Sequence, residues 1–385
     1  MQTKPLVRPF KLPPLIDPSF SNGNNVPYWN NEAVRLPEEY DWTFTVQRQL
    51  TGSTVLEAGY NATIGAHLEA GLLNLNQLPF GDFQKYGLSL LQSNITSAAA
   101  RAAGIPIPYP GFTGSVAQAL RPYPQYLTVD TSAGNGDKSG HSTYHSMVLK
   151  LQRRFSQGFA LQTSYVLSKI MSDADSYQIT GIYSLDQYNR RLDKSIGTYD
   201  QTHNFKISYV WELPFGRGKH WLSSGLASRV IGGWRFSGIQ SVQSGLPVPL
   251  TNNNTYNIFN GRTPATVSTY DGWETHASNP NWFGSDRFFQ SPSYFGPQPA
   301  NQLGNAPRYN PKARTRPNFG NNISLAKSIG LRESMHVDFR VEAFNLFNSP
   351  RFGAGSTNLS DPNFGLVRTQ LNPPRQLQMA LKLYF

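Results

Sequence analysis

The carboxy-terminal residues, 375–385, alternate strictly between large apolar side chains and polar or small ones. In an extended strand, five apolar residues would share one face: Leu377, Met379, Leu381, Leu383 and Phe385. Such a face would make the edge strand of a soluble protein aggregate, whereas a strand of a membrane barrel meets lipid there. The pattern therefore predicts the last strand of a transmembrane β-barrel.

Residues 335–344 show an equally clear alternation with a different chemistry. Four ionisable residues occupy every second position: His336, Asp338, Arg340 and Glu342. Ionisable side chains gathered on one face can lie neither against lipid nor in a dry core. This segment therefore predicts a strand whose polar face lines a wet lumen or contacts a polar plug.

Period-two alternation recurs along most of the chain and predicts nine strands in all. The other seven runs cover residues 40–50, 54–60, 143–155, 159–168, 203–212, 233–243 and 321–329. The fold class expected from them is all-β, an antiparallel transmembrane barrel of which residues 40–385 form a part. Residues 1–39 are rich in proline and are expected to be irregular, as a loop of the larger barrel.

The predicted connections alternate in length. Short turns are expected at residues 50–53, 156–158 and 330–334, with a longer one at 213–232 on the same side. Long loops rich in Asn, Gly, Pro and Ser are expected at residues 61–142, 169–202, 244–320 and 348–374. Outer-membrane barrels have short periplasmic turns and long extracellular loops, so the carboxyl end should be periplasmic. This alternation of short and long connections requires residues 126–130 to be part of a loop and not a tenth spanning strand.

An odd number of strands cannot close a barrel of the even-numbered bacterial type. We therefore expect further strands in sequence that would precede this chain. The first twenty residues contain several prolines and no apolar core, so they do not form a secretory signal peptide. Since a barrel must be exported, we expect the chain to be the carboxy-terminal part of a longer protein.

Composition and charge further limit the classes of protein and of binding partner that fit this chain. The chain is 38% hydrophobic and 13% aromatic, and it contains no run of about 18 apolar residues that would predict a membrane helix. The net charge of +11 raises the question of nucleic acid, but the basic residues are scattered, which does not favour it. Anionic lipopolysaccharide or an acidic solute fits this diffuse charge better. The absence of cysteine excludes thiol catalysis and cysteine zinc sites.

Seven segments in the same order resemble TonB-dependent outer-membrane receptors, specifically the Oar-like group with a carboxypeptidase-regulatory-like domain. They are residues 42–50, 120–126, 164–169, 212–219, 232–238, 341–348 and the terminal strand. The resemblance implies a barrel of about 22 strands, of which this chain supplies the last nine. It also implies a plug and a segment that contacts TonB, both in the missing amino-terminal part. One departure is Asn322, where the group tends to have Asp.

The resemblance also bears on assembly and on membrane partners. It implies that the barrel-assembly machinery reads the terminal strand, through Leu381, Leu383 and Phe385. The expected partners are this machinery, outer-membrane lipid and lipopolysaccharide, with no nucleic acid. Trp42, Trp211, Trp234 and Tyr384 lie near predicted strand ends and are expected to form an interfacial aromatic girdle.

Two groups of residues are candidates for contact with solute. The lumen-facing candidates are Asp338, Arg340 and Glu342 on one strand, and Lys206 and Glu212 on another. They either pair with one another and with plug residues, as buried charges usually do, or hold the plug and contact passing solute.

The second group lies in the longest loop, where aromatic residues stand among Asn, Gly and Ser: Trp273, Trp282, Phe283 and Phe288. Such side chains can stack on sugar rings or on aromatic chelates, and long loops often carry binding sites. They can equally pack against one another and hold the loop above the barrel.

Motifs of metal binding and catalysis are missing. His141 and His145 are four residues apart in a strand-like region, which separates them by about 13 Å. Asp173, Asp175 and Asp186 lack the spacing and glycine of an EF-hand. There is no GxSxG, HExxH or phosphate-binding loop. We therefore expect no enzymatic activity, no metal and no cofactor.

The main functional hypothesis is the carboxy-terminal barrel part of a TonB-dependent transporter, located in the bacterial outer membrane. It would move a scarce, bulky solute inward, of the oligosaccharide or chelate class. The alternative is a passive or structural outer-membrane barrel, or an adhesin, without TonB coupling. A soluble β-sandwich that binds lectin-like ligands is a third hypothesis, and it would leave rows such as Trp42, Phe44 and Val46 exposed unless a second sheet covered them.

Overall fold

Nine long antiparallel strands form one sheet in the computed structural model, which describes residues 22–28, 35–69, 75–130, 138–174, 186–250, 307–332 and 335–385. The strands are β2 (Glu38–Thr51), β3 (Thr54–Leu68), β5 (Gly140–Ser156), β6 (Phe159–Ser172), β8 (His203–Glu212), β9 (Trp234–Gln243), β10 (Asn318–Arg332), β11 (Met335–Phe344) and β12 (Gln376–Tyr384). Each pairs with its neighbour in chain order. The predicted all-β, antiparallel architecture and its nine strands are confirmed.

Several strands are longer than the alternation predicted. A barrel strand needs about 9–11 residues to cross a bilayer, whereas β5 has 17 and β3 has 15. The pairing of β3 with β5 continues to Leu68, where 60 was the predicted end. The boundaries of all four predicted loops were wrong: the connections are residues 69–139, 173–202, 244–317 and 345–375. The added part of β3 includes the small residues Ala62, Gly65 and Ala66, which give the alternation little contrast.

The register gives the sheet two chemically distinct faces. Residues paired directly across neighbouring strands point to the same side of a sheet. One row of such partners across six strands is apolar: Val46, Ala58, Leu149, Tyr165, Phe205 and Val242. The adjacent row on the other side is polar: Gln47, Glu57, Lys150, Ser164, Lys206 and Ser241. We call these sides the apolar face and the polar face.

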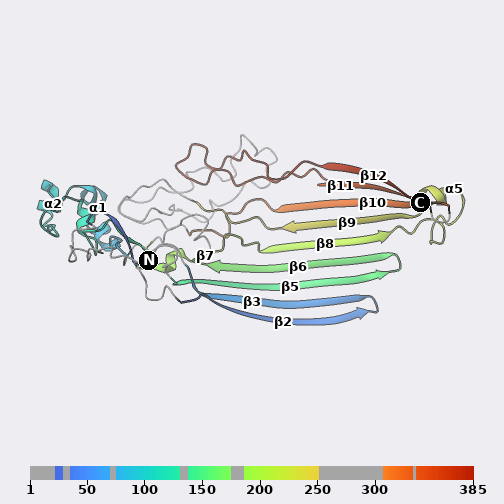
Figure 1. Ribbon diagram of the computed structural model, residues 1–385, viewed down its shortest axis with the longest axis horizontal. Coiled ribbons are helices and arrows are strands. Elements are labelled where there is room, and N and C mark those ends of the chain that lie inside the picture. The colour runs from blue at the N-terminus through green and yellow to red at the C-terminus, as the bar shows by residue number, and fades with distance from the viewer. Residues whose placement is uncertain are drawn as a thin grey trace, which may run out of the picture.

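Connections of different kinds gather at the two ends of the sheet, as Figure 1 shows. The turn end carries the short hairpin connections and the carboxyl terminus, and the loop end carries the long connections with helices α1 and α2. Between β5 and β6, Gln157 and Gly158 have φ of 53° and 76°, the two positive values of a type I′ hairpin turn. Short and long connections therefore alternate as predicted.

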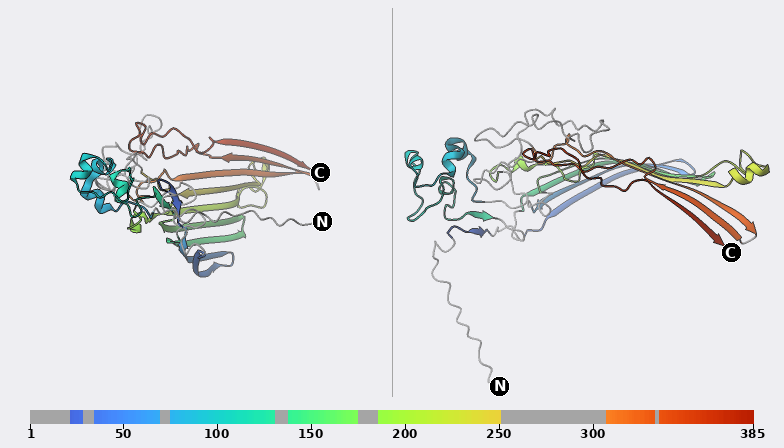
Figure 2. Two further views of the ribbon diagram at one scale, coloured as in Figure 1. Left: turned by 60° about the vertical axis from the view of Figure 1, so that its left-hand side comes forward. Right: turned by 90° about the horizontal axis from the view of Figure 1, so that it is seen from above.

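The sheet is curved and open. Figure 2 shows the curvature in the view from above. The edge strands are β2 and β12, and within the described residues they do not pair with each other. A two-residue strand, β7 (Ser195–Ile196), adds to β6 at the loop end.

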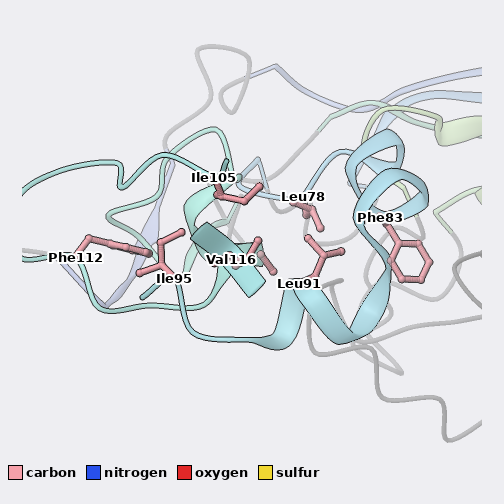
Figure 3. Packing of buried hydrophobic residues seen from close by; sticks show 9 residues of the cluster. Leu78, Phe83, Leu91, Ile95, Ile105, Phe112 and Val116 are labelled. Carbon is pink, nitrogen blue, oxygen red and sulfur yellow. The ribbon is translucent and has the colours of Figure 1, made fainter. Parts of the chain in front are cut away.

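Residues 75–130 form a small folded unit at the loop end, which we call the helical module. It contains α1 (Phe80–Gln92), α2 (Ala98–Ala102) and α3 (Val116–Ala119). Apolar side chains form its own core: Leu78, Phe83, Leu91, Ile95, Ile105, Phe112 and Val116 (Figure 3). The long loop predicted over 61–142 therefore contains a folded unit that was not foreseen. None of the described helices is both long and apolar enough to cross a bilayer.

A parallel pair of short strands joins the helical module to the amino-terminal region. Strand β4 (Thr128–Asp130) pairs with β1 (Asn25–Pro27), apart from the large sheet. Residues 126–130 are therefore not a tenth spanning strand, as predicted. The described part of segment 1–39 is not wholly irregular, because it supplies β1 and the start of β2.

Candidate functional site

All five lumen-facing candidates lie on the polar face of the sheet. Lys206 and Glu212 come from β8, and Asp338, Arg340 and Glu342 come from β11. The strand register puts candidates from the two strands in one row. Glu212 lies opposite Arg235 on β9, Arg235 lies opposite Ala326 on β10, and Ala326 lies opposite Arg340. The candidates thus share one face, although Glu212 and Asp338 are 126 positions apart in the sequence.

Ion pairs occupy the polar face near the turn end. The Glu212 carboxylate accepts a hydrogen bond from Lys219 Nζ at 3.0 Å and lies 3.6 Å from Arg235 Nη2. Arg340 Nη1 lies 3.6 Å from Glu342 Oε1 on the same strand. The candidates therefore pair only in part with one another. Arg235 was missed, since its place opposite Glu212 follows from the strand register. Lys219 was missed because the fold of the β8–β9 connection brings it back to Glu212.

A second group of polar contacts lies on the same face near the β2 edge. Glu57 accepts hydrogen bonds from Lys150 Nζ at 2.8 Å and from Gln47 Nε2 at 2.6 Å. Lys206 belongs to the same row, two strands beyond Lys150, with Ser164 between them. Charged and amide side chains thus extend from one edge region of the sheet towards the other.

Two of the hollows along the described sheet are lined by lumen-facing candidates. The larger, about 590 Å³, spans β5 to β11, and residues lining it include Gln152, Arg154, Gln162, Ser208, Ile239, Asn322, Glu342 and Phe344. The smaller, about 470 Å³, is lined in part by Glu212, Asp338 and Arg340. The hollows bring four of the five candidates together in two places and leave Lys206 outside both.

His145 and His203 each contact the hydroxyl group of a tyrosine. His145 Nδ1 is 2.7 Å from the Tyr60 hydroxyl, and His203 Nδ1 is 2.8 Å from the Tyr165 hydroxyl. Among the described residues there is no group of three or more His, Asp or Glu that could hold a metal ion. Asp186 accepts a hydrogen bond from Gln77 of the helical module.

The residues expected to carry the assembly signal lie at the end of the chain, and the structure does not describe the aromatic candidates of the longest loop. Leu381 and Leu383 lie on the apolar face, and Phe385 is 95% exposed at the chain end. Trp273, Trp282, Phe283 and Phe288 lie outside the described residues.

Among the expected girdle residues, Tyr384 differs from the three tryptophans. Trp42, Trp211 and Trp234 belong to rows of the apolar face. Tyr384 lies opposite His336 on the polar face and stacks on its ring, with centroids 4.4 Å apart. It therefore cannot take part in a lipid-facing girdle, because a girdle residue must point towards lipid.

The segment 341–348, one of the seven that carry the resemblance, holds the end of the sheet together. Asn345 and Asn348 have φ of 51°, a left-handed conformation that Asn tolerates better than most residues. Asn345 Nδ2 donates to the carbonyls of Ser349 and Pro373. Asn348 Oδ1 accepts from the Arg375 amide at 2.9 Å. These contacts tie the β11–β12 loop back to the start of β12.

A buried cluster at the loop end was not foreseen. We call Asp200, Thr202, Arg308 and Arg314 the loop-end cluster. Arg314 Nη2 donates to Asp200 Oδ2 at 2.5 Å and to Thr202 Oγ1 at 3.1 Å, and Arg308 Nη2 donates to the Ser172 carbonyl at 2.8 Å. These partners are more than 100 residues apart in sequence, so no local pattern could have indicated them.

Comparisons with known proteins agree with this architecture. The sequence matches the model of the outer membrane beta barrel domain family over residues 2–378. No curated protein matches it.

Two outer-membrane proteins are among the solved structures that match the chain. The outer membrane transporter YddB from Escherichia coli is 9% identical, with 95% of this chain and 34% of that chain covered and a TM-score of 0.40. The ferripyoverdine receptor of Pseudomonas aeruginosa is 7% identical, with 91% and 27% covered and a TM-score of 0.38. The chain thus spans about a third or less of the length of these proteins. By its family match, the chain belongs to the outer membrane beta barrel domain family and is a protein of the bacterial outer membrane.

Proposed function

We propose that this chain forms the carboxy-terminal barrel wall of an Oar-like, TonB-dependent transporter for a scarce, bulky solute of the oligosaccharide or chelate class. The observation that carries the proposal is the division of the sheet into an apolar face and a polar face with charged side chains in adjoining rows. Such a wall is apolar towards lipid and wet on its inner side. The resemblance of segments such as 341–348 supports the Oar-like assignment.

In this proposal the loops capture solute, TonB displaces a plug, and the solute moves inward along the polar face. Glu212, Asp338 and Arg340 lie in one hollow, where their charges can exchange partners between neighbours, plug and solute. The wall and loops come from this chain. The contact with TonB comes from the amino-terminal part of the complete transporter.

The remaining partners follow from the same proposal. Lipid and lipopolysaccharide cover the apolar face, which carries Met379, Leu381 and Leu383 at its β12 edge. The barrel-assembly machinery binds β12 through Leu381, Leu383 and the terminal Phe385, because this edge strand offers unpaired backbone groups to an incoming strand.

Uptake by cells that carry the complete locus tests the proposal. Labelled oligosaccharides and ferric chelates are offered with and without a proton-motive force. At least one should accumulate, and its uptake should stop when the inner membrane is depolarised. Arg340→Glu should lower this uptake at unchanged surface level, because it places a third carboxylate beside Asp338 and Glu342.

A matched control keeps the charge change but moves it away from the polar face. Lys85→Glu lies on α1 of the helical module, outside both hollows, and should lower uptake less than Arg340→Glu does if the wall carries the solute. Uptake that continues without a proton-motive force, or that responds equally to both variants, would contradict the proposal.

A surface role without TonB coupling is the second candidate, and the helical module is the observation that favours it. A loop unit with its own core of nine buried apolar residues can present a fixed surface outside the membrane. In that case, removal of residues 75–130 should abolish attachment of cells to a surface while solute uptake stays insensitive to the proton-motive force.

A further inference from the structure

The connection between β8 and β9, residues 213–233, is folded and not a simple turn. It contains α5 (Gly225–Ile231), and the Phe215 and Trp221 rings lie 5.7 Å apart. The two ends of the connection approach each other closely at Gly216 and Gly232. A Cβ atom on Gly216 would lie only 2.6 Å from the Cα of Gly232, so a side chain would not fit there. The Gly216 amide also donates to the Trp221 carbonyl at 2.9 Å. The segment therefore has a defined shape at the turn end (Figure 1).

The end of α5 is tied to the lipid side of the wall. Lys327 and Trp234 lie opposite each other on the apolar face. Lys327 Nζ donates to the carbonyls of Arg229 and Val230 at 2.6 and 2.8 Å, and Trp234 Nε1 donates to Val230 at 3.1 Å. A cation at the carboxyl end of a helix is also favourable for the helix dipole. Two side chains of the apolar face thus hold the last turn of α5.

Large apolar side chains of this connection are exposed. Leu226 is 79% exposed and Val230 is 69% exposed, and their spacing of four places them on one side of α5. Three further residues are between 45% and 52% exposed: Trp221, Leu222 and Ile231. Together with Trp234, they extend the apolar face beyond the strand ends. A surface of this kind on a membrane protein indicates contact with lipid.

The charges in the same segment are all of one sign. It carries Arg217, Lys219, His220 and Arg229 and contains no Asp or Glu. Lys219 pairs with Glu212, whereas Arg217 and Arg229 are exposed beside the apolar side chains. Exposed leucine, valine and tryptophan next to arginine are the chemistry of a segment that lies in the headgroup region of an anionic membrane surface.

We propose that the β8–β9 connection is an interfacial anchor that inserts Leu226 and Val230 into the phospholipid leaflet at the turn end of the wall. Arg217 and Arg229 bind anionic headgroups there. With the orientation expected from the connection lengths, this is the periplasmic leaflet. Continuity with the apolar face and the positive charge of the segment favour this anchor whether or not the protein transports a solute.

Because the chain has no cysteine, a single reporter can be placed at will. Leu226→Cys in the full chain is labelled with an environment-sensitive fluorophore, and the protein is placed in nanodiscs with or without about a third phosphatidylglycerol. Lipids that carry a quencher near the headgroup should quench this label strongly. The matched control, Lys85→Cys on the helical module, should be quenched only by soluble quenchers. Val230→Cys repeats the measurement if Leu226→Cys fails to fold.

The role of the two exposed arginines is tested in the same nanodiscs. Arg217→Gln and Arg229→Gln should each lower the insertion equilibrium by about fivefold in phosphatidylglycerol discs and leave it unchanged in neutral discs. A label at residue 226 that is quenched like the Lys85→Cys control would overturn the proposal. Protection from soluble quenchers without lipid quenching would also overturn it, because a protein or second copy would then cover the segment.

Discussion

Replacement of Arg314 by methionine should loosen the loop end of the wall. Arg314 joins the β6–β8 and β9–β10 connections, since it donates to the carbonyls of Asp200, Gly245 and Pro311 at 2.8–3.0 Å. Its Nη2 also donates to the Asp200 carboxylate, whose side chain is only 1% exposed. Methionine keeps most of the volume of the arginine but removes every donor.

The expected magnitude follows from what remains around Asp200. Its carboxylate keeps two donors after the change, the Ile170 amide at 2.9 Å and the Thr202 hydroxyl at 3.0 Å. Removal of one partner from a buried ion pair costs about 3–5 kcal/mol, because a buried charge is left uncompensated. Because Arg314 is itself 18% exposed and water can reach the site, we expect the lower end of that range.

Hydrogen exchange measures this change where it occurs. A loss of about 3 kcal/mol corresponds to an increase of roughly 150-fold in local opening. The amides of residues 195–202 and 310–316 should exchange faster by about that factor. The central residues of β5 and β6 should keep their protection, because the wall does not depend on the loop-end cluster.

A double variant separates the buried charge from general loss of packing. Asp200→Asn with Arg314→Met removes both charges, so most of the lost protection should return. If the single and double variants exchange equally fast, the uncompensated carboxylate is not the cause and the reasoning is refuted.

Three further predictions test the faces of the sheet and its loops. Met379→Arg, on the apolar face, should destabilise the protein in lipid vesicles by about 2–4 kcal/mol in urea unfolding, whereas Ala380→Arg, one residue along on the polar face, should cost little. Equal costs would contradict the register. Asn345→Ala should cost about 2–4 kcal/mol in the same assay, since it loses hydrogen bonds to Ser349 and Pro373 at a left-handed position; Asn345→Gly should cost less. Hydrogen bonds from Ser356 and the Asn363 amide lower the pKa of Asp361 below 3.8, so its stabilisation is complete above 3.8 and disappears as pH falls through the folded value. A titration of the Asp361 carboxyl by NMR that shows an unshifted midpoint would contradict this.

The strand pattern was predictable because lipid on one side and water on the other impose a period of two. Thus Met379 and Ala380 could be given opposite faces from their positions alone, and the register agrees. The ends of strands were less predictable. β3 continues to Leu68, and its added part includes the small residues Ala62, Gly65 and Ala66, which give the alternation little contrast in hydrophobicity.

The helical module shows a different limit of the sequence. Its core comes from residues such as Leu78, Phe83 and Val116, which are scattered among turns and belong to helices of only 4–13 residues. Short helices carry a weak period, so residues 75–130 look like a long polar loop. Their packing against one another makes them a unit.

By itself, the sequence determined the number of strands, their two faces and the five charged residues that share the polar face. These depend on neighbours along one strand, where the period of two is visible. Only the tertiary structure decided which charges pair, as with Glu212 and Arg235, and which loops join, as with Asp200 and Arg314. Such contacts depend on strand register and on chain segments far apart in sequence, and the free energy of burying a charge beside its partner leaves no trace in the local order of residues.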